Sequence, residues 1–144
     1  MKRLLAAAAA SAAVASFPAH AAPSCKNLSV TPLAFGNYDV FNATPNDSVG
    51  TISYSCPPPT TPTVTIDVGL AFANGRRRMT RSAGGDWLSY DIFVDAPRTV
   101  VWSSTPVNVP AGNAASVPFY GRLFAQQGVS QGSYSDTLVV TFTF

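Results

Sequence analysis

Apolar and polar residues alternate with a period of two along most of the sequence beyond residue 21. This alternation is typical of half-buried β-strands, because successive side chains of a strand point to opposite faces of its sheet. It recurs in five stretches, 52–56, 64–70, 88–94, 117–123 and 138–144, of which the last is the longest and clearest. A shorter apolar run, Leu28–Phe35, is expected to open the sheet. No stretch repeats at 3.6 residues, so the pattern predicts an all-β chain.

Turn-forming residues separate these stretches. Asn74-Gly75, Gly84-Gly85, Gly112-Asn113 and Gly132 mark chain reversals, and the proline-rich run 57–62 predicts a loop between two strands. Pro118 suggests an edge or a bulge in its strand. Short strands punctuated in this way, in a chain long enough for one domain, predict an immunoglobulin-like Greek-key sandwich.

The first 21 residues have the pattern of a secretory signal peptide. Lys2 and Arg3 form a positive region, Leu4–Val14 is apolar, and Ala19-His20-Ala21 is a small-x-small cleavage site. The apolar stretch is shorter than the ~20 residues of a membrane-spanning helix. We therefore expect cleavage after Ala21, which removes the single histidine of the sequence and leaves residues 22–144 as one exported domain.

Two cysteines, Cys25 and Cys56, remain in the exported part. In an oxidising compartment they predict one disulfide, and two buried free thiols are the alternative. Closing this loop would contribute on the order of 3–4 kcal/mol in the chain-entropy model. Two cysteines without a histidine make a poor zinc site, so no metal centre is expected.

Charged residues make up only 11% of the chain, and its net charge of +2 comes wholly from Lys2 and Arg3. This balance argues against nucleic-acid binding. The exported part holds neither His nor Glu, so the usual general bases reduce to seven Asp residues, and no catalytic residue, cofactor or small-molecule substrate is expected. Asp86 and Asp91 resemble a glycosidase pair only superficially, and surface positions are the favoured interpretation.

Two further features allow a binding role. Arg76–Arg78 with Arg81 could bind phosphate or an acidic polymer, although a solvated hairpin end is the favoured interpretation. Trp87 and Trp102 would be carbohydrate-stacking platforms if exposed, but packing in the core or at an interface is favoured. A carbohydrate-binding module is thus one hypothesis for the function. It ranks third, after the two hypotheses that are given below.

A series of short motifs runs in order along residues 22–144. The motifs are Cys25; Phe35–Asp39; Gly50, Ile52 and Cys56; Arg78-Met79; Leu88–Tyr90 with Phe93 and Asp95; Trp102; Phe119–Arg122; and Gly132–Thr137 followed by Leu138–Phe144. In this order and spacing they resemble the spore coat protein U domain, the fold unit of archaic chaperone-usher pilins.

The resemblance implies a sandwich that lacks its last strand, with the gap filled by a strand from a sister pilin subunit or a periplasmic chaperone. An outer-membrane usher would be the third partner, and the protein would pass through the periplasm to a pilus on the cell surface. Because the printed sequence ends at Phe144, the long apolar final strand has no successor to pair with. We expect Leu138, Val140, Phe142 and Phe144 to line the strand-acceptor groove.

The sequence departs from polymerising pilins at its start. After cleavage at Ala21 only Ala22–Ser24 precede Cys25, and three residues reach about 10 Å, too short for a donor strand. Cleavage after Ala15 would leave Ser16–Ser24, with Phe17 as its one large apolar anchor. The leading hypothesis is therefore a minor or tip-located strand acceptor of a pilus that serves adhesion or biofilm formation. The alternative is a non-polymerising spore-coat or extracellular matrix protein of the same fold.

Overall fold

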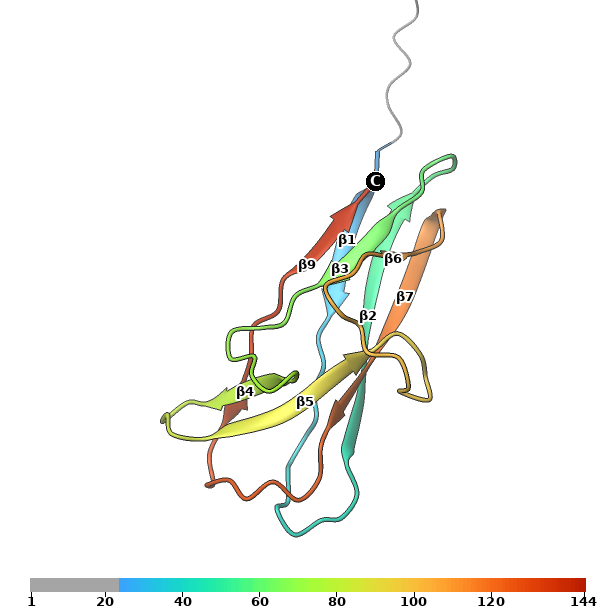
Figure 1. The fold of residues 1–144 in the computed structure, drawn as a ribbon. Helices are drawn as coiled ribbons and strands as arrows, with labels where there is room; N and C mark the ends of the chain where they lie inside the picture. Colours follow the sequence, from blue (N-terminus) through green and yellow to red (C-terminus); the bar gives the residue numbers. More distant parts are fainter. Residues whose placement is uncertain (1–23) are drawn as a thin grey trace, which may run out of the picture.

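The computed structural model describes residues 24–144, so the predicted signal peptide and its cleavage site lie outside the described residues. Nine antiparallel strands form two sheets, one of six strands in the order β1-β2-β7-β5-β4-β8 and one of three in the order β6-β3-β9 (Figure 1). The strands are β1 (Lys26–Thr31), β2 (Asn46–Cys56), β3 (Thr63–Ile66), β4 (Arg77–Arg81), β5 (Trp87–Phe93), β6 (Val107–Asn108), β7 (Gly112–Leu123), β8 (Tyr134–Ser135) and β9 (Val140–Thr143). The predicted immunoglobulin-like all-β fold is confirmed. Residues 24–144 contain no helix suited to crossing a membrane.

The long strands β2 and β7 form the spine of the larger sheet. They pair from Asn46↔Leu123 to Cys56↔Gly112, and the register shifts between Tyr54 and Cys56. Strand β5 pairs with β7 only from Tyr120 to Leu123. Pro118 therefore lies where β7 is paired on the β2 side alone, which agrees with the edge position that a residue without an N–H donor favours.

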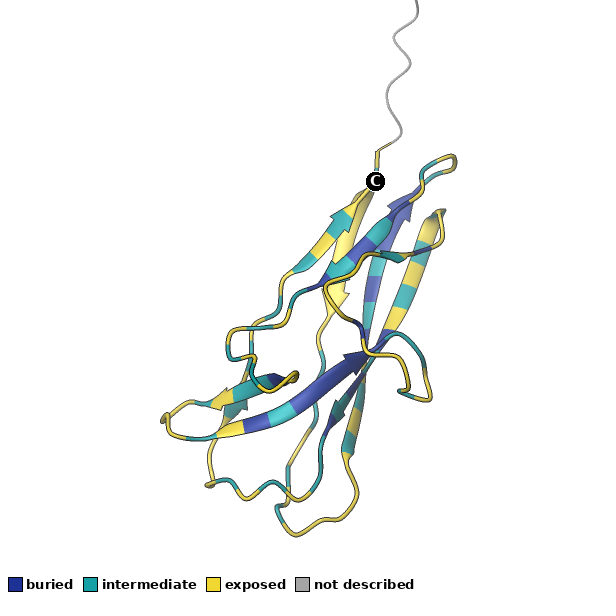
Figure 2. Ribbon diagram, viewed as in Figure 1, coloured by how far each residue is buried: buried dark blue, intermediate teal, exposed yellow. Residues whose placement is uncertain are grey.

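The core lies between the two sheets, where the inward faces of the predicted strands meet (Figure 2). Its buried members are Ile52, Tyr54, Cys56, Val64, Ile66, Leu88, Tyr90, Ile92, Trp102, Val109, Phe119 and Leu123. They follow the period-two pattern along β2, β3 and β5, as the sequence predicted. Trp102 is 1% exposed, so its predicted packing role is confirmed.

Two strands are shorter than predicted, for a shared reason. The predicted strand 64–70 ends at Ile66, and the predicted strand 138–144 forms a ladder only over Val140–Thr143. At the break the Asp67 backbone amide still donates to the Val139 carbonyl, and the Asp67 carboxylate accepts hydrogen bonds from the amides of Gly69 and Val139, so a side-chain cap ends the ladder. Leu70, expected on the buried face, is consequently 81% exposed.

One member of the arginine cluster departs from the solvated hairpin end that the sequence favoured, whereas Arg76 is exposed and Arg78 and Arg81 are half-buried. Asn74-Gly75 does form a tight reversal, with φ of 54° and 73°, but Arg77 begins strand β4 and is only 2% exposed. Asp91, expected at the surface, is 6% exposed and pairs with Arg77. Trp87 is 45% exposed, so it does not pack in the core of this chain.

The two cysteines lie next to each other where β1 and β2 begin to pair. Cys25 and Cys56 form a disulfide directly beside the Lys26↔Ser55 pair, and Cys56 is fully buried. Strand β1 extends only to Thr31, because Pro32 has no amide hydrogen to donate. The chain therefore leaves the ladder earlier than the predicted run Leu28–Phe35.

Candidate functional site

Two edge strands from different sheets border one opening in the sandwich. Strand β1 pairs only with β2, and strand β9 pairs only with β3. The two strands lie near each other in Figure 1, and among the described strands no ladder joins them. Each edge strand thus presents a row of backbone groups that no strand of residues 24–144 pairs with.

An apolar cavity of about 290 Å³ occupies this opening. One wall comes from Val30, Leu33 and Phe35, and the opposite wall from Leu138 and Val140. The lining also includes the buried core residues Ile66, Tyr90 and Phe119. Every residue of β1 is exposed, including Leu28 at 49% and Val30 at 42%, so the opening leaves apolar side chains uncovered.

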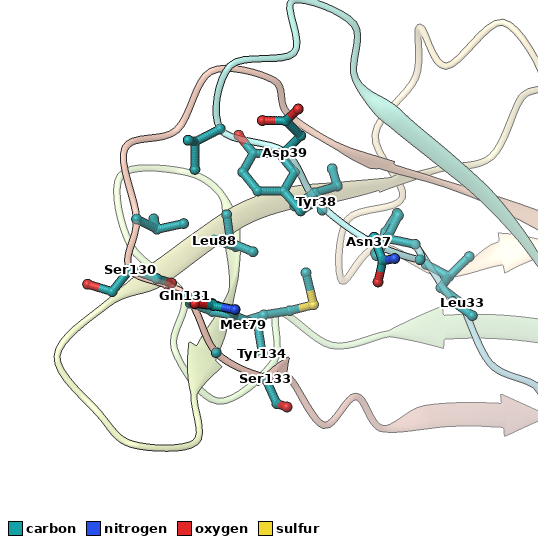
Figure 3. Close-up of a pocket in the computed structure, with 17 residues that line it drawn as sticks. Leu33, Asn37, Tyr38, Asp39, Met79, Leu88, Ser130, Gln131, Ser133 and Tyr134 are labelled. Atoms are coloured by element: carbon teal, nitrogen blue, oxygen red, sulfur yellow. Dashed lines mark hydrogen bonds between the residues drawn. The ribbon is translucent and has the colours of Figure 1, made fainter.

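A second cavity of about 910 Å³ continues the first one along the molecule. It lies between segments 33–40 and 129–134, and Figure 3 shows Met79 and Leu88 in the space between them. The two cavities share Leu33, Phe35, Met79 and Tyr134 as lining residues, so they form one groove. We call this feature the β1/β9 groove. Its second half is more polar, because Asn37, Asp39, Ser130, Gln131 and Ser133 line it.

Hydrogen bonds fix the β9 side of the groove to the adjoining loop. The Asp136 carboxylate accepts bonds from the Leu70 amide at 2.9 Å and the Tyr90 hydroxyl at 2.7 Å. Burial, and then the bond to Asp136, raise the pKa of Tyr90 well above its ordinary value, so the phenol stays a donor. The β9 side of the groove is thus attached to the loop that follows β3. None of these hydrogen bonds reaches β1, so the gap between β1 and β9 stays open.

Side chains of the second half hold its two segments in place. The Tyr38 hydroxyl accepts a hydrogen bond from the backbone amide of Gln127 at 2.7 Å, and the Tyr134 hydroxyl donates to the Ser130 carbonyl at 2.7 Å. Gly121 allows Leu33 and Phe35 to pack tightly against β7, because a Cβ there would lie 2.6 Å from Leu33. The groove is therefore a preformed feature of the fold.

Comparison with known proteins identifies the family. The model of the spore coat protein U domain matches residues 8–141. The chain belongs to the spore coat protein U domain family. It is also 35% identical over 127 residues to Protein U of Myxococcus xanthus, an alignment that covers 78% of this chain and 71% of the relative. This spore coat protein U domain protein is a structural protein and not an enzyme, as the sequence predicted.

A solved structure shares the fold. It is the pre-assembly complex of the chaperone CsuC and the tip adhesion subunit CsuE from the archaic chaperone-usher Csu pili of Acinetobacter baumannii. The match has a TM-score of 0.63 at 24% identity and covers 85% of the spore coat protein U domain chain. It covers 40% of the solved chain, so the present chain spans less than half of that length.

The four residues predicted for the groove have different positions in the spore coat protein U domain. Leu138 and Val140 line the first cavity. Phe142 is half-buried, and its ring centroid lies 4.8 Å from that of Tyr54. Phe144 is 60% exposed and lies outside both cavity linings, 6.3 Å from Phe142.

The opposite wall was not among the predicted groove residues. Val30, Pro32, Leu33 and Phe35 form it, and all four fall in the apolar run that the sequence assigns to the opening strand. The sequence therefore shows that this run is apolar. It does not show that the run faces residues more than 100 positions later across the groove, because that depends on the order of strands in the two sheets.

Proposed function

We propose that this protein is a secreted structural subunit of an archaic chaperone-usher pilus that accepts a strand from a partner. The observation that carries the proposal is the apolar groove between the unpaired edges of β1 and β9. A strand inserted there can form main-chain hydrogen bonds with the edge strands, while alternate side chains cover Ile66, Tyr90 and Phe119. Each large apolar side chain that is buried contributes about 1.5–3 kcal/mol.

The partners follow from the order of assembly. A periplasmic chaperone would occupy the groove first, an outer-membrane usher would receive the complex, and a sister pilin subunit would then replace the chaperone strand. The solved relative, which is a chaperone bound to a pilus subunit, supports the first step by analogy of fold. The protein would accordingly pass through the periplasm to a pilus on the cell surface.

We further propose a minor or tip position that serves adhesion or biofilm formation. The support is the predicted cleavage after Ala21, which leaves three residues ahead of Cys25. So short a segment cannot span a groove that extends over two cavities. The subunit would accept a strand without donating one, which suits the position where assembly begins.

The second candidate function is a non-polymerising spore-coat or extracellular matrix protein. The family description and the 35% identity to Protein U of Myxococcus xanthus favour it. In that case the groove would stay unfilled by sister subunits, and the domain would be stable alone. The two functions therefore differ in how the purified protein responds to a strand.

The deciding experiment is thermal unfolding of the periplasmic protein with and without a synthetic peptide that copies the N-terminal strand of a sister pilin. At a hundredfold excess over Kd the peptide adds about 2.7 kcal/mol, which raises Tm by about 10 °C in a domain of this size. Val140→Asp, in the groove lining, should abolish this rise. Thr141→Asp, on the neighbouring exposed position, is the matched control and should retain it.

If the peptide raises the Tm of neither the wild type nor the Thr141→Asp variant, the acceptor mechanism is contradicted. The coat protein is then the better explanation. N-terminal sequencing tests the tip position separately. We expect a start at Ala22 and no ladders of purified protein that resist mild denaturant. A start at Ser16 or earlier, or such ladders, would contradict the acceptor-only role without affecting the groove.

A further inference from the structure

Two arginine–aromatic pairs lie outside the groove lining, one on strands β4 and β5 and one formed by the residues directly before β4 and after β7. The guanidinium of Arg78 lies 4.9 Å from the ring centroid of Trp87, and that of Arg76 lies 4.0 Å from the ring centroid of Phe124. These distances fall within the range of cation–π attraction. None of the four residues lines the β1/β9 groove. We call the four residues the cation–aromatic face.

The register of the sheet puts these residues on one surface. Arg78 pairs with Ser89 and Thr80 pairs with Trp87, whereas the intervening pair, Met79 and Leu88, faces the core. Because successive side chains alternate, Arg78 and Trp87 point to the opposite, outer face. Phe124 directly follows the buried Leu123, so alternation places its ring away from the core, where it contacts Arg76. A strand inserted between β1 and β9 would leave this face uncovered.

The cationic groups of this face carry charge that is not neutralised locally. Within residues 24–144 the ion pairs involve Arg77, Arg98 and Arg122, and neither Arg76 nor Arg78 takes part in one. The Nε of Arg78 donates to the Ala71 carbonyl at 2.6 Å, which orients the guanidinium and leaves its two Nη groups as donors. Trp87 remains 45% exposed beside it. The guanidinium covers one face of the indole, and the exposed remainder of Trp87, beside the two Nη groups, is available to a ligand.

We propose that the cation–aromatic face binds a carboxylate-bearing polysaccharide, with uronic-acid rings as the recognised units. A pyranose ring presents an apolar C–H face that stacks on an indole, and its carboxylate accepts two parallel hydrogen bonds from a guanidinium. Each of the two guanidinium groups lies beside an aromatic ring, so each pair offers a charged donor and an apolar surface to one uronic-acid unit. This activity goes beyond the pilus function, which does not require it.

Charge balance favours this ligand over nucleic acid. Residues 24–144 hold equal numbers of cationic and anionic side chains, so the domain has no long-range attraction for a dense polyphosphate. Two guanidinium groups would neutralise little of such a polymer. A sparsely charged sugar chain needs fewer cations and gains more from stacking on Trp87.

The test measures binding of the full exported chain to polygalacturonate by affinity gel electrophoresis, with neutral dextran as the comparison polymer. We expect retardation by polygalacturonate, weaker retardation at high salt and none by dextran. Arg78→Gln and Trp87→Ala should each weaken binding about tenfold. Lys26→Gln removes the same charge from the distant edge strand β1 and should leave binding unchanged.

The fold of each variant is checked by thermal unfolding. If Trp87→Ala does not fold, Arg76→Gln replaces it with the same expected loss. Absence of retardation by polygalacturonate would overturn the proposal, as would an equal loss in Lys26→Gln. Single-stranded DNA that binds as tightly and competes for the site would also overturn it, because the face would then be a general polyanion site.

Discussion

The guanidinium of Arg77 donates a hydrogen bond to the carboxylate of Asp91 at 3.0 Å, and both side chains are buried. The same guanidinium donates to the carbonyls of Asp67 at 2.9 Å, Ile66 at 3.1 Å and Trp102 at 2.8 Å. One side chain of β4 thereby connects β5 of the larger sheet with β3 of the smaller sheet. A buried charge is tolerated here because the guanidinium uses four of its five N–H donors, one of them on a carboxylate.

Arg77→Gln should therefore destabilise the domain severely. The change leaves Asp91 as an uncompensated buried charge, and loss of one member of a buried pair costs about 3–5 kcal/mol. Urea unfolding measures the effect, and Arg78→Gln on the neighbouring residue is the matched control, with an expected cost below about 1 kcal/mol. Equal costs for the two variants would show that the buried network contributes little.

Gly50 allows β2 and β7 to pack closely around an aromatic ring. It pairs with Phe119, and a Cβ at this position would overlap the Phe119 ring. Gly50→Ala should cost about 1–3 kcal/mol in urea unfolding, because the buried ring must move. Gly112→Ala, at the other end of the same strand pair, places its Cβ 3.4 Å from Ala115 and should be nearly neutral. A second change, Phe119→Leu, should recover part of the loss in the Gly50 variant.

Much of the fold follows from local pattern. The alternation of Ile52, Tyr54 and Cys56, and that of Leu88, Tyr90 and Ile92, predicts both the strands and the buried face, because one face of each strand has to leave water. The reversal at Asn74-Gly75 follows from the tolerance of these residues for positive φ.

The remaining features depend on contacts between distant segments. Arg77 is buried only because acceptors from Ile66, Asp91 and Trp102 converge on it, and no local pattern announces that convergence. The same holds for the groove. Its two walls, around Val30 and Val140, face each other because of the order of strands in the two sheets. Sequence pattern identifies apolar edges, and topology determines which edges face each other.

The disulfide leads to a prediction about oxidation state and stability. Cys25 and Cys56 close a loop with a sequence separation of 31. Cys56→Ser should cost roughly 2–5 kcal/mol in urea unfolding and lower the periplasmic yield. Mass spectrometry after alkylation without reduction should find no modified cysteine in the wild type, whereas two alkylated cysteines would contradict the bridge. Cys25→Ser with Cys56→Ser should cost about as much as either change alone, because both remove the same bond.

Asp47 makes the stability of the domain dependent on acid. Its carboxylate accepts bonds from Arg122 at 2.8 and 2.9 Å and lies 3.3 Å from Arg98, and these arginines, chiefly Arg122, lower the pKa of Asp47. Because the folded pKa lies below the unfolded value of about 3.9, the stabilisation is complete above that value and is lost as pH falls through the folded pKa. The pair is partly exposed, so its contribution is about 1 kcal/mol or less. Asp47→Asn should thus destabilise the protein in urea at neutral pH and become equivalent to the wild type in strong acid. The difference between the two proteins at neutral pH should shrink in an Arg122→Gln background, and a difference that is independent of pH would contradict this role.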